Sequence, residues 1–267
     1  MLVLNGPIQT RDDGCAVDFS PAWMVRSMFG GAVAATIVRA ARLTLGIELP
    51  LSDAHFTFLA PTPAGSATVR VTPLRRGRRF ADAVATVESR GVTTAQASLS
   101  FSPTPPSLAS RDAPRAAVEF PRSHVSFDGA IEWQPARPTR AGVILSRIRA
   151  RGGASTLQPD EWACIAADLI GPGALTPDRG PFAVATATLA ISLIETAAPA
   201  EWWHQHLTTR ASDDLADGIL DLTSADGRLL ARAHQRAALL PAEAHEMPQS
   251  ATAFANSSLD SLMIGMN

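Results

Sequence analysis

Gln235 is the residue whose type is least expected for its position in the sequence. The segment 227–241, GRLLARAHQRAALLP, follows an Asp-Gly turn and alternates as a strand does. This alternation puts Gln235 on the same face as Leu229, Ala231 and Ala233, which is expected to be buried. A buried carboxamide has four hydrogen-bonding positions, and leaving them empty costs about 1–3 kcal/mol. Gln235 is therefore expected to face a backbone group, a water in the core, or a substrate.

The histidines are candidates for metal binding or acid–base chemistry. His204 and His206 alternate within the segment HQH, so a strand there would present both imidazoles on one face, as a metal pair requires. Glu201 is the nearest further ligand, and a solvated strand also accounts for the pattern, so we expect no metal. His55, in the segment DAHFTF, is expected to contact substrate or to lie in the core or at its rim.

Two further segments could bind an anion. The segment RRGRR, residues 75–79, reads as a hairpin loop, and Arg76 and Arg78 could contact the phosphates of a ligand such as coenzyme A. A solvated turn explains the same residues. The pair Gly30-Gly31 opens a helical segment whose first N–H groups have no partner within the helix. These groups could hold an anion or a carbonyl oxygen, or the glycines could allow a tight start to the helix.

Composition limits the classes of partner. The 267 residues, 46% of them hydrophobic and 18% charged, are typical of a folded protein with a large core. All 23 basic residues are arginine, and the net charge of −2 gives no general attraction for nucleic acid or an anionic membrane. No signal peptide and no membrane span are expected. Cys15 and Cys164 have no metal-like spacing and fit a reducing cytoplasm.

The sequence repeats with a period of about 135 residues, which is half the chain. A helical segment precedes an alternating strand in each half, at residues 30–46 in the first half and 158–173 in the second. Each half then has a hairpin, with its turn at Gly91 or Gly227. A helix followed by a meander of antiparallel strands, made twice, predicts an α+β fold.

These elements predict the domain organisation. An N-terminal domain, a Pro/Ser-rich linker, a C-terminal domain and a tail are expected at residues 1–101, 102–123, 124–245 and 246–267.

Several segments taken together resemble the acyl-CoA thioesterase II family. These are MFGGAVAATIVRAA, HFTFLAPTPAG, LRRGRRFADAVATVESRG and DGRLLARAHQRAAL, in that order, and the resemblance covers the chain from about Gly14 to Leu240. It implies a double hotdog, in which two antiparallel sheets each wrap around a central helix. It also implies hydrolysis of an acyl-CoA thioester to a free acid and CoA, without a metal or redox cofactor.

The resemblance assigns three catalytic residues. In the family an Asp, a Thr or Ser, and a Gln of the second hotdog hold the attacking water, and they match Asp168, Thr186 and Gln235. A carboxylate can accept the proton of the water, particularly if burial raises its pKa. The hydroxyl and the amide can orient the water. A thiolate leaves readily, so no strong acid is needed, and the chain lacks the G-x-S-x-G motif of serine hydrolases. We expect the three side chains to share one water.

One departure from the family keeps a second function open. Many members carry Asp-His two and three positions after the Thr, where this chain has Thr188 and Leu189. A hotdog that binds an acyl group or acyl-CoA without turning it over is therefore the alternative. Hydration or dehydration of an enoyl thioester is a third possibility, but it usually needs a His with an Asp or Glu, and the sequence offers no convincing pair. The open sheet edges of hotdogs are usually covered, so a homo-oligomer is expected.

Overall fold

The structure, a computed structural model, describes residues 8–11, 14–25, 27–103, 120, 123–136, 142–168 and 182–241. Most of the expected linker and all of the expected tail lie outside the described residues.

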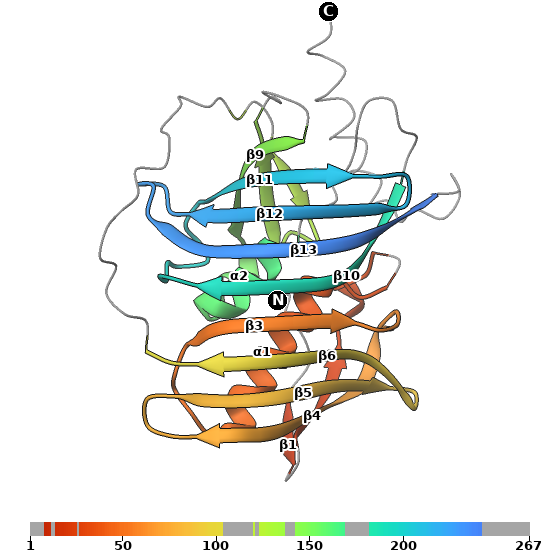
Figure 1. Cartoon of the computed structure of the whole chain (residues 1–267), viewed down its shortest axis with the longest axis vertical. Helices are drawn as coiled ribbons and strands as arrows, with labels where there is room; N and C mark the ends of the chain where they lie inside the picture. Colours follow the sequence, from red (N-terminus) through yellow and green to blue (C-terminus); the bar gives the residue numbers. More distant parts are fainter. Residues whose placement is uncertain are drawn as a thin grey trace, which may run out of the picture.

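All thirteen strands of the described chain form one antiparallel sheet, in the order β1-β2-β4-β5-β6-β3-β10-β13-β12-β11-β9-β8-β7 (Figure 1). The strands of the first half are β1 (Gln9–Arg11), β2 (Gly14–Phe19), β3 (Leu51–Phe58), β4 (Gly65–Arg76), β5 (Ala81–Ser89) and β6 (Val92–Phe101). Those of the second half are β7 (His124–Ser126), β8 (Ile131–Pro135), β9 (Val143–Ala150), β10 (Phe182–Leu193), β11 (Trp203–Ala211), β12 (Leu215–Thr223) and β13 (Leu229–Pro241). Strands β3 and β10 pair antiparallel and join the halves edge to edge.

Each half packs its sheet on one α-helix. The helices α1 (Gly30–Leu45) and α2 (Pro159–Ala167) lie on the same face of the sheet (Figure 1). Short 3-10 helices, η1 (Pro21–Trp23) and η2 (Gly152–Thr156), precede them. Helix α1 is rich in alanine and buried on almost every side, as a central helix must be, and it ends at Gly46 in the left-handed conformation. This is the expected double hotdog.

The order of the strands corrects the expectation of a simple meander. Strands β4, β5 and β6 do follow one another, but β3 pairs with β6 rather than with β4. The corresponding strand of the second half, β10, pairs with β13 in the same way. Each half therefore places the first strand after its α-helix at the junction, where β3 and β10 pair.

The two halves repeat even their irregularities at the period expected from the sequence. In β10 a β-bulge lies between Thr186 and Thr188, and in β3 a bulge lies between Leu51 and Asp53. Thr186 pairs with the residue two positions after Gln235, and Leu51 pairs with the residue two positions after Leu99. Leu51 and Leu99 thus occupy in the first half the positions of Thr186 and Gln235, and both are buried.

Strand β13 follows the predicted alternation except at its start. Ala231, Ala233 and Gln235 are buried as expected, whereas Leu229 is only half-buried and Leu230 is fully buried. A bulge explains this difference, since Thr223 pairs with Leu229 while Leu222 pairs with Ala231. The extra residue at Leu230 interrupts the alternation and puts its side chain in the core.

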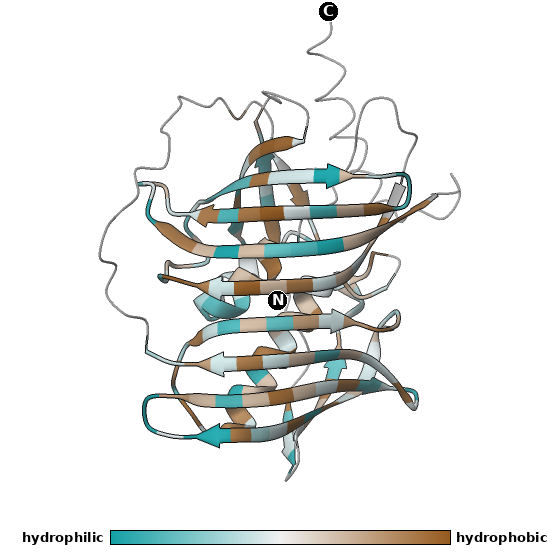
Figure 2. Cartoon of the chain, viewed as in Figure 1, coloured by the Kyte–Doolittle hydropathy of each residue, from teal (hydrophilic) through white to brown (hydrophobic). Residues whose placement is uncertain are grey.

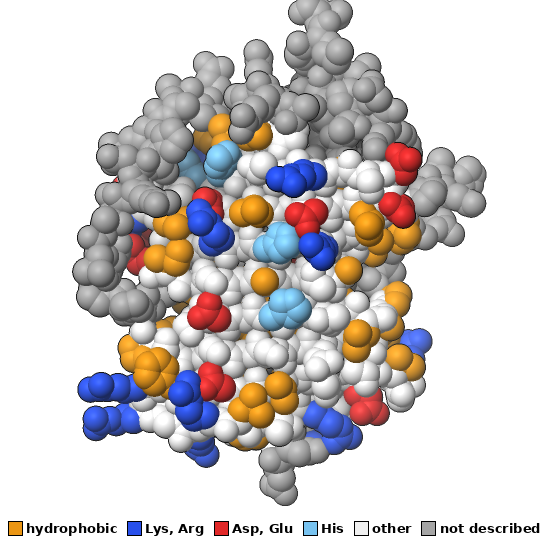
Figure 3. Space-filling view, viewed as in Figure 1, with side chains coloured by type: hydrophobic (Ala, Val, Ile, Leu, Met, Phe, Trp, Pro, Cys, Tyr) orange, Lys and Arg blue, Asp and Glu red, His pale blue; other side chains and the backbone are white. Residues whose placement is uncertain are grey.

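The face of the sheet away from the helices is open in the described chain. Apolar and polar residues alternate along its strands (Figure 2), and acidic, basic and histidine side chains are spread over it (Figure 3). Two ion-pair groups join β12 to β13 here, one between Arg232 and Asp221 and the other joining His234 and Arg236 to Asp217. No helix within the described residues is long and apolar enough to cross a membrane.

Candidate active site

Asp168, Thr186 and Gln235 form one hydrogen-bonded cluster. Asp168 follows the last residue of α2, Thr186 lies on β10 and Gln235 on β13, so the three come from separate elements. The Thr186 hydroxyl donates to Asp168 Oδ1 over 2.8 Å, and Gln235 Nε2 donates to the same Oδ1 and, over 2.8 Å, to Thr186 Oγ1. Asp168 is 4% exposed and Gln235 3%. The carboxamide of Gln235 therefore faces a polar side-chain cluster.

The bulge in β10 is what turns Thr186 toward this cluster. Leu189 and Ile191 are buried on the inner face, so strict alternation would place Ala187 inside and Thr186 outside. The extra residue, Ala187, shifts the alternation by one, and Thr186 pairs with Ala237 on the same face as Gln235. A bulge beside a functional residue commonly re-aims a side chain in this way.

The fourth partner of the cluster comes from the first half. The Gly31 N–H, in the first turn of α1, donates to Asp168 Oδ2 over 2.6 Å. A Cβ on Gly31 would lie 2.8 Å from Ile165 Cα and 2.9 Å from the Cys164 carbonyl oxygen of α2, so glycine allows the two helices to touch. This close approach brings the start of α1 against the end of α2, where Asp168 lies.

Gly30 makes room for the carboxylate itself. A Cβ on Gly30 would lie 2.6 Å from Asp168 Oδ2 and 3.2 Å from Phe58 Cζ. The carboxylate and the aromatic ring therefore flank the same point, and Phe58 forms an apolar wall beside the cluster. The absence of a Cβ at Gly30 and Gly31 thus allows the start of α1 to lie this close to Asp168.

Burial sets the acid–base character of Asp168. Loss of hydration raises the pKa of Asp168 to about 7, and the hydrogen bonds from Thr186, Gly31 and Gln235 lower it by less than burial raises it. The positive end of the α1 dipole also favours the ionised carboxylate. A carboxylate with a pKa near neutrality is suited to accept a proton in the neutral pH range.

An ion-pair group that the sequence analysis missed, with buried carboxylates and partly exposed arginines, holds the start of α2. Arg39 of α1 binds Glu161 through two hydrogen bonds, of 3.0 and 2.5 Å, and Arg42 binds both Asp160 and Glu161. Asp160 also accepts the Leu51 N–H over 2.9 Å. The capping pattern Gln158-x-x-Glu161 was visible in the sequence, but its arginine partners lie more than a hundred residues away.

The structure places the glycine pair expected as an anion or carbonyl cradle, Gly30 and Gly31, against Asp168. The Gly31 N–H already donates to Asp168, so this amide holds the carboxylate rather than a ligand oxygen. Gly30 faces the same carboxylate. The anionic partner at this helix start is therefore a side chain of the same chain.

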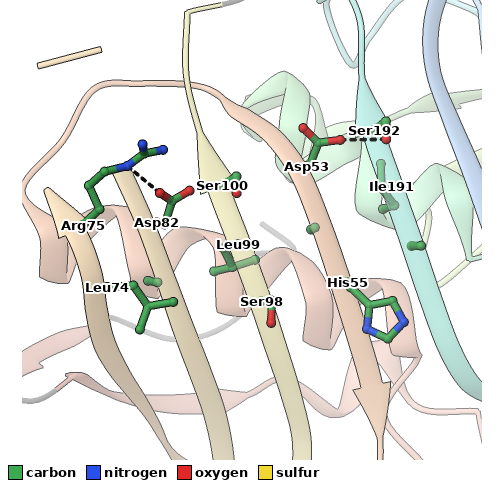
Figure 4. Close-up of a pocket in the computed structure, with 13 residues that line it drawn as sticks. Asp53, His55, Leu74, Arg75, Asp82, Ser98, Leu99, Ser100, Ile191 and Ser192 are labelled. Atoms are coloured by element: carbon green, nitrogen blue, oxygen red, sulfur yellow. Dashed lines mark hydrogen bonds and ion pairs between the residues drawn. The ribbon is translucent and has the colours of Figure 1, made fainter. Parts of the chain in front are cut away.

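His55 lies on the other face of the sheet from Asp168. It is exposed on β3 and lines a groove of about 640 Å³ that Asp53, Arg75, Asp82 and Ser192 also line (Figure 4). In Figure 4 helix α1 lies behind these strands. His55 is therefore not brought to the cluster.

The arginines expected at phosphate groups are also distant from the cluster. Arg76 Nη2 lies against Gly46, at the end of α1 opposite to Gly31, which a helix of this length puts about 20 Å away. Arg78 is exposed in the turn between β4 and β5, which confirms the predicted hairpin loop.

The remaining histidine pair lies outside the site as well. His204 and His206 share the outward face of β11, because Trp203, Gln205 and Leu207 between and beside them point into the core. Within the described residues no three side chains of His, Cys, Asp or Glu are grouped to hold a metal ion.

Comparison with known proteins supports the resemblance noted from the sequence. Residues 19–102 match the family described as the acyl-CoA thioesterase N-terminal domain. No curated protein sequence is significantly similar to the chain.

Solved structures share the fold over nearly the whole chain. An acyl-CoA thioesterase II from Mycobacterium marinum is 17% identical and has a TM-score of 0.71, with 90% of this chain and 96% of that chain covered. A hot dog protein of unknown function from Alicyclobacillus acidocaldarius is 16% identical and has a TM-score of 0.75, with 89% and 97% covered. At these identities the likeness establishes the double-hotdog fold.

Proposed function

We propose that this chain, whose residues 19–102 match the acyl-CoA thioesterase N-terminal domain, hydrolyses acyl-CoA thioesters with Asp168 as general base. The observation that carries the proposal is the buried cluster of Asp168, Thr186 and Gln235 at the start of α1. These are the three residues that the resemblance assigns to the attacking water. The family match and the fold support a thioesterase, and the cluster supplies groups that such a reaction needs.

The geometry suits Oδ1 of Asp168 as the basic atom. Oδ2 is held by the Gly31 N–H, while Oδ1 faces the hydroxyl of Thr186 and the amide of Gln235. A water bound among these groups would be directed by Thr186 and Gln235 toward the thioester carbonyl. Its oxygen would bond to the carbonyl carbon as its proton passes to Oδ1.

Collapse of the tetrahedral intermediate completes the reaction. The carbon–sulfur bond breaks, the acid is released, and the CoA thiolate takes a proton, directly or through solvent, to restore the ionised Asp168. Negative charge on the carbonyl oxygen would be favoured by the N-terminal dipole of α1 and by side-chain donors. A thiolate is a good leaving group, so a separate acid is not required.

A matched pair of substitutions tests the role of Asp168. Asp168→Asn keeps the size of the side chain but removes the base, and we expect kcat for thiol release to fall about a hundredfold or more. Asp53→Asn is the control, because Asp53 is exposed on the outer face and bonded to Ser192. It should leave kcat within twofold of wild type.

The same assay separates hydrolysis from the alternatives. Binding of acyl-CoA by the wild type, without thiol release at any chain length, would replace hydrolysis with a non-catalytic binding function. Leu189, where many family members have His, is fully buried beside Gln235. This departure from the family favours the binding alternative. Enoyl hydration is less well supported, because His55, His204, His206 and His234 all lie on the outer face of the sheet.

A further inference from the structure

A second buried glutamine, Gln205, forms a network behind α2. It lies on β11 and is 3% exposed. Its Oε1 accepts from Trp133 Nε1 over 3.1 Å and from Ser146 Oγ over 2.7 Å, and its Nε2 donates to the Ala166 carbonyl oxygen over 2.9 Å. Both lone pairs of the amide oxygen are thus used, and the direction of the amide nitrogen is fixed.

The Ala166 carbonyl oxygen, which accepts from Gln205 Nε2, lies at the end of the helix that precedes Asp168. Ala166 is in the last turn of α2, where carbonyl groups lack partners within the helix, and Asp168 follows two residues later. Helix α2 has nine residues, too few to be stable by itself, so tertiary contacts, including those at its ends, hold it in place. Arg39 and Arg42 hold its start, and Gln205 holds its end.

Small displacements at this end matter for Asp168. The hydrogen bonds to Oδ1 and Oδ2 come from β10, β13 and α1, whereas the Asp168 backbone is attached to α2. A shift of the helix end would therefore move the carboxylate relative to all of its donors. A misplacement of about 1 Å can cost an enzyme about a hundredfold in rate.

We propose that Gln205 is a positioning residue, which fixes the end of α2 so that the Asp168 carboxylate meets Gly31, Thr186 and Gln235. This inference rests on the proposed function for its effect on catalysis. The geometric part, the placing of Asp168, does not depend on catalysis. It can be followed through the Gly31 amide, which donates to Asp168 over 2.6 Å.

The experiment compares Gln205→Met with a packing control, using the full chain. Met has nearly the length of Gln but neither donates to Ala166 nor accepts from Trp133 and Ser146. The control is Ile148→Val, a core substitution on β9 that removes one methylene group and leaves the network intact. The readouts are kcat and KM for thiol release from acyl-CoA, and the amide proton resonance of Gly31 in a 1H–15N spectrum.

We expect Gln205→Met to lower kcat about tenfold or more, with KM within twofold. The Gly31 resonance should move toward its position in Asp168→Asn. Ile148→Val should change neither readout. Ser146→Ala, a milder variant that removes one donor to Gln205, should produce an intermediate change in both, and it replaces Gln205→Met if that protein does not fold.

Two results would overturn the inference or separate it from the proposed function. If Gln205→Met and Ser146→Ala lose stability but keep kcat and the Gly31 resonance, Gln205 is structural only. If the wild type releases no thiol while the Gly31 resonance moves in Gln205→Met, the proposed function fails and the positioning of Asp168 by Gln205 stands.

Discussion

Raising the pH across neutrality is expected to increase activity and to weaken the fold together, because both effects come from Asp168. Burial raises the pKa of Asp168 from 3.8 to about 7. As a base Asp168 acts only when ionised, so kcat/KM should fall about tenfold for each pH unit below 7 and level off above it. Thiol release measured with 4,4′-dithiodipyridine, which works in acid, gives this profile directly.

The free energy of unfolding should decrease as the pH rises, whereas kcat/KM should increase. Because the folded pKa lies above the unfolded one, the protonated carboxyl is favoured in the folded state. Its stabilising contribution is complete below about pH 4 and is lost as the pH rises to about 7. A shift of about three pKa units corresponds to about 4 kcal/mol, of which about 3 kcal/mol falls between pH 5 and 8.

Asp168→Asn isolates this contribution, since other titrating groups affect both proteins alike. Urea unfolding at pH 5 and pH 8 should show the wild type losing about 3 kcal/mol more than the variant between the two conditions. Equal losses in the two proteins would show that the folded pKa of Asp168 is not raised. A kcat/KM that stays constant from pH 5 to 8 would show that Asp168 is not the base.

Three further outcomes are expected. Gly30→Ala should lower kcat at least about tenfold in steady-state kinetics, because the new methyl group would lie 2.6 Å from Asp168 Oδ2. An unchanged kcat would show that the carboxylate can move aside. Gln235→Ala should lower kcat about a hundredfold with KM changed less than threefold, since the amide orients rather than binds; a rise in KM alone would assign it to substrate affinity. Sedimentation should give a multiple of the 28.1 kDa chain mass, because β1 and β7 leave sheet edges to be covered, and a monomer at micromolar concentration would contradict this.

Local patterns in the sequence predicted much of this fold. Alternation identified the inward face at Gln235, and the Gly turns placed the two hairpins, because both signals depend on neighbouring residues. Helix α1 was delimited by its glycines. The same local character explains the error at Leu229, which a bulge turns away from the buried face without a sequence signal.

Contacts between distant segments could not be read in the same way. The resemblance to a family, not the spacing, brought Asp168 and Thr186 together with Gln235, and nothing nearby in the sequence indicates that Gly31 donates to Asp168. The arginines that bind Asp160 and Glu161, and the link from Gln205 to Ala166, likewise depend on how two helices and a strand pack. These contacts follow from tertiary structure, in which residues far apart in sequence become neighbours.

The matching bulges of β3 and β10 carry a consequence for the origin of the chain. An irregularity at the same register in both halves is what duplication and fusion of a single-hotdog gene would leave. The ancestral pair would then have had two equivalent centres. In the fused chain Leu51 and Leu99 stand where a second hydroxyl and a second amide would be needed, so the first half keeps the backbone kink without the side chains. The hydroxyl and the amide of the cluster are thus kept in the second half, while the first half contributes the Gly31 N–H and the contacts of α1 with α2.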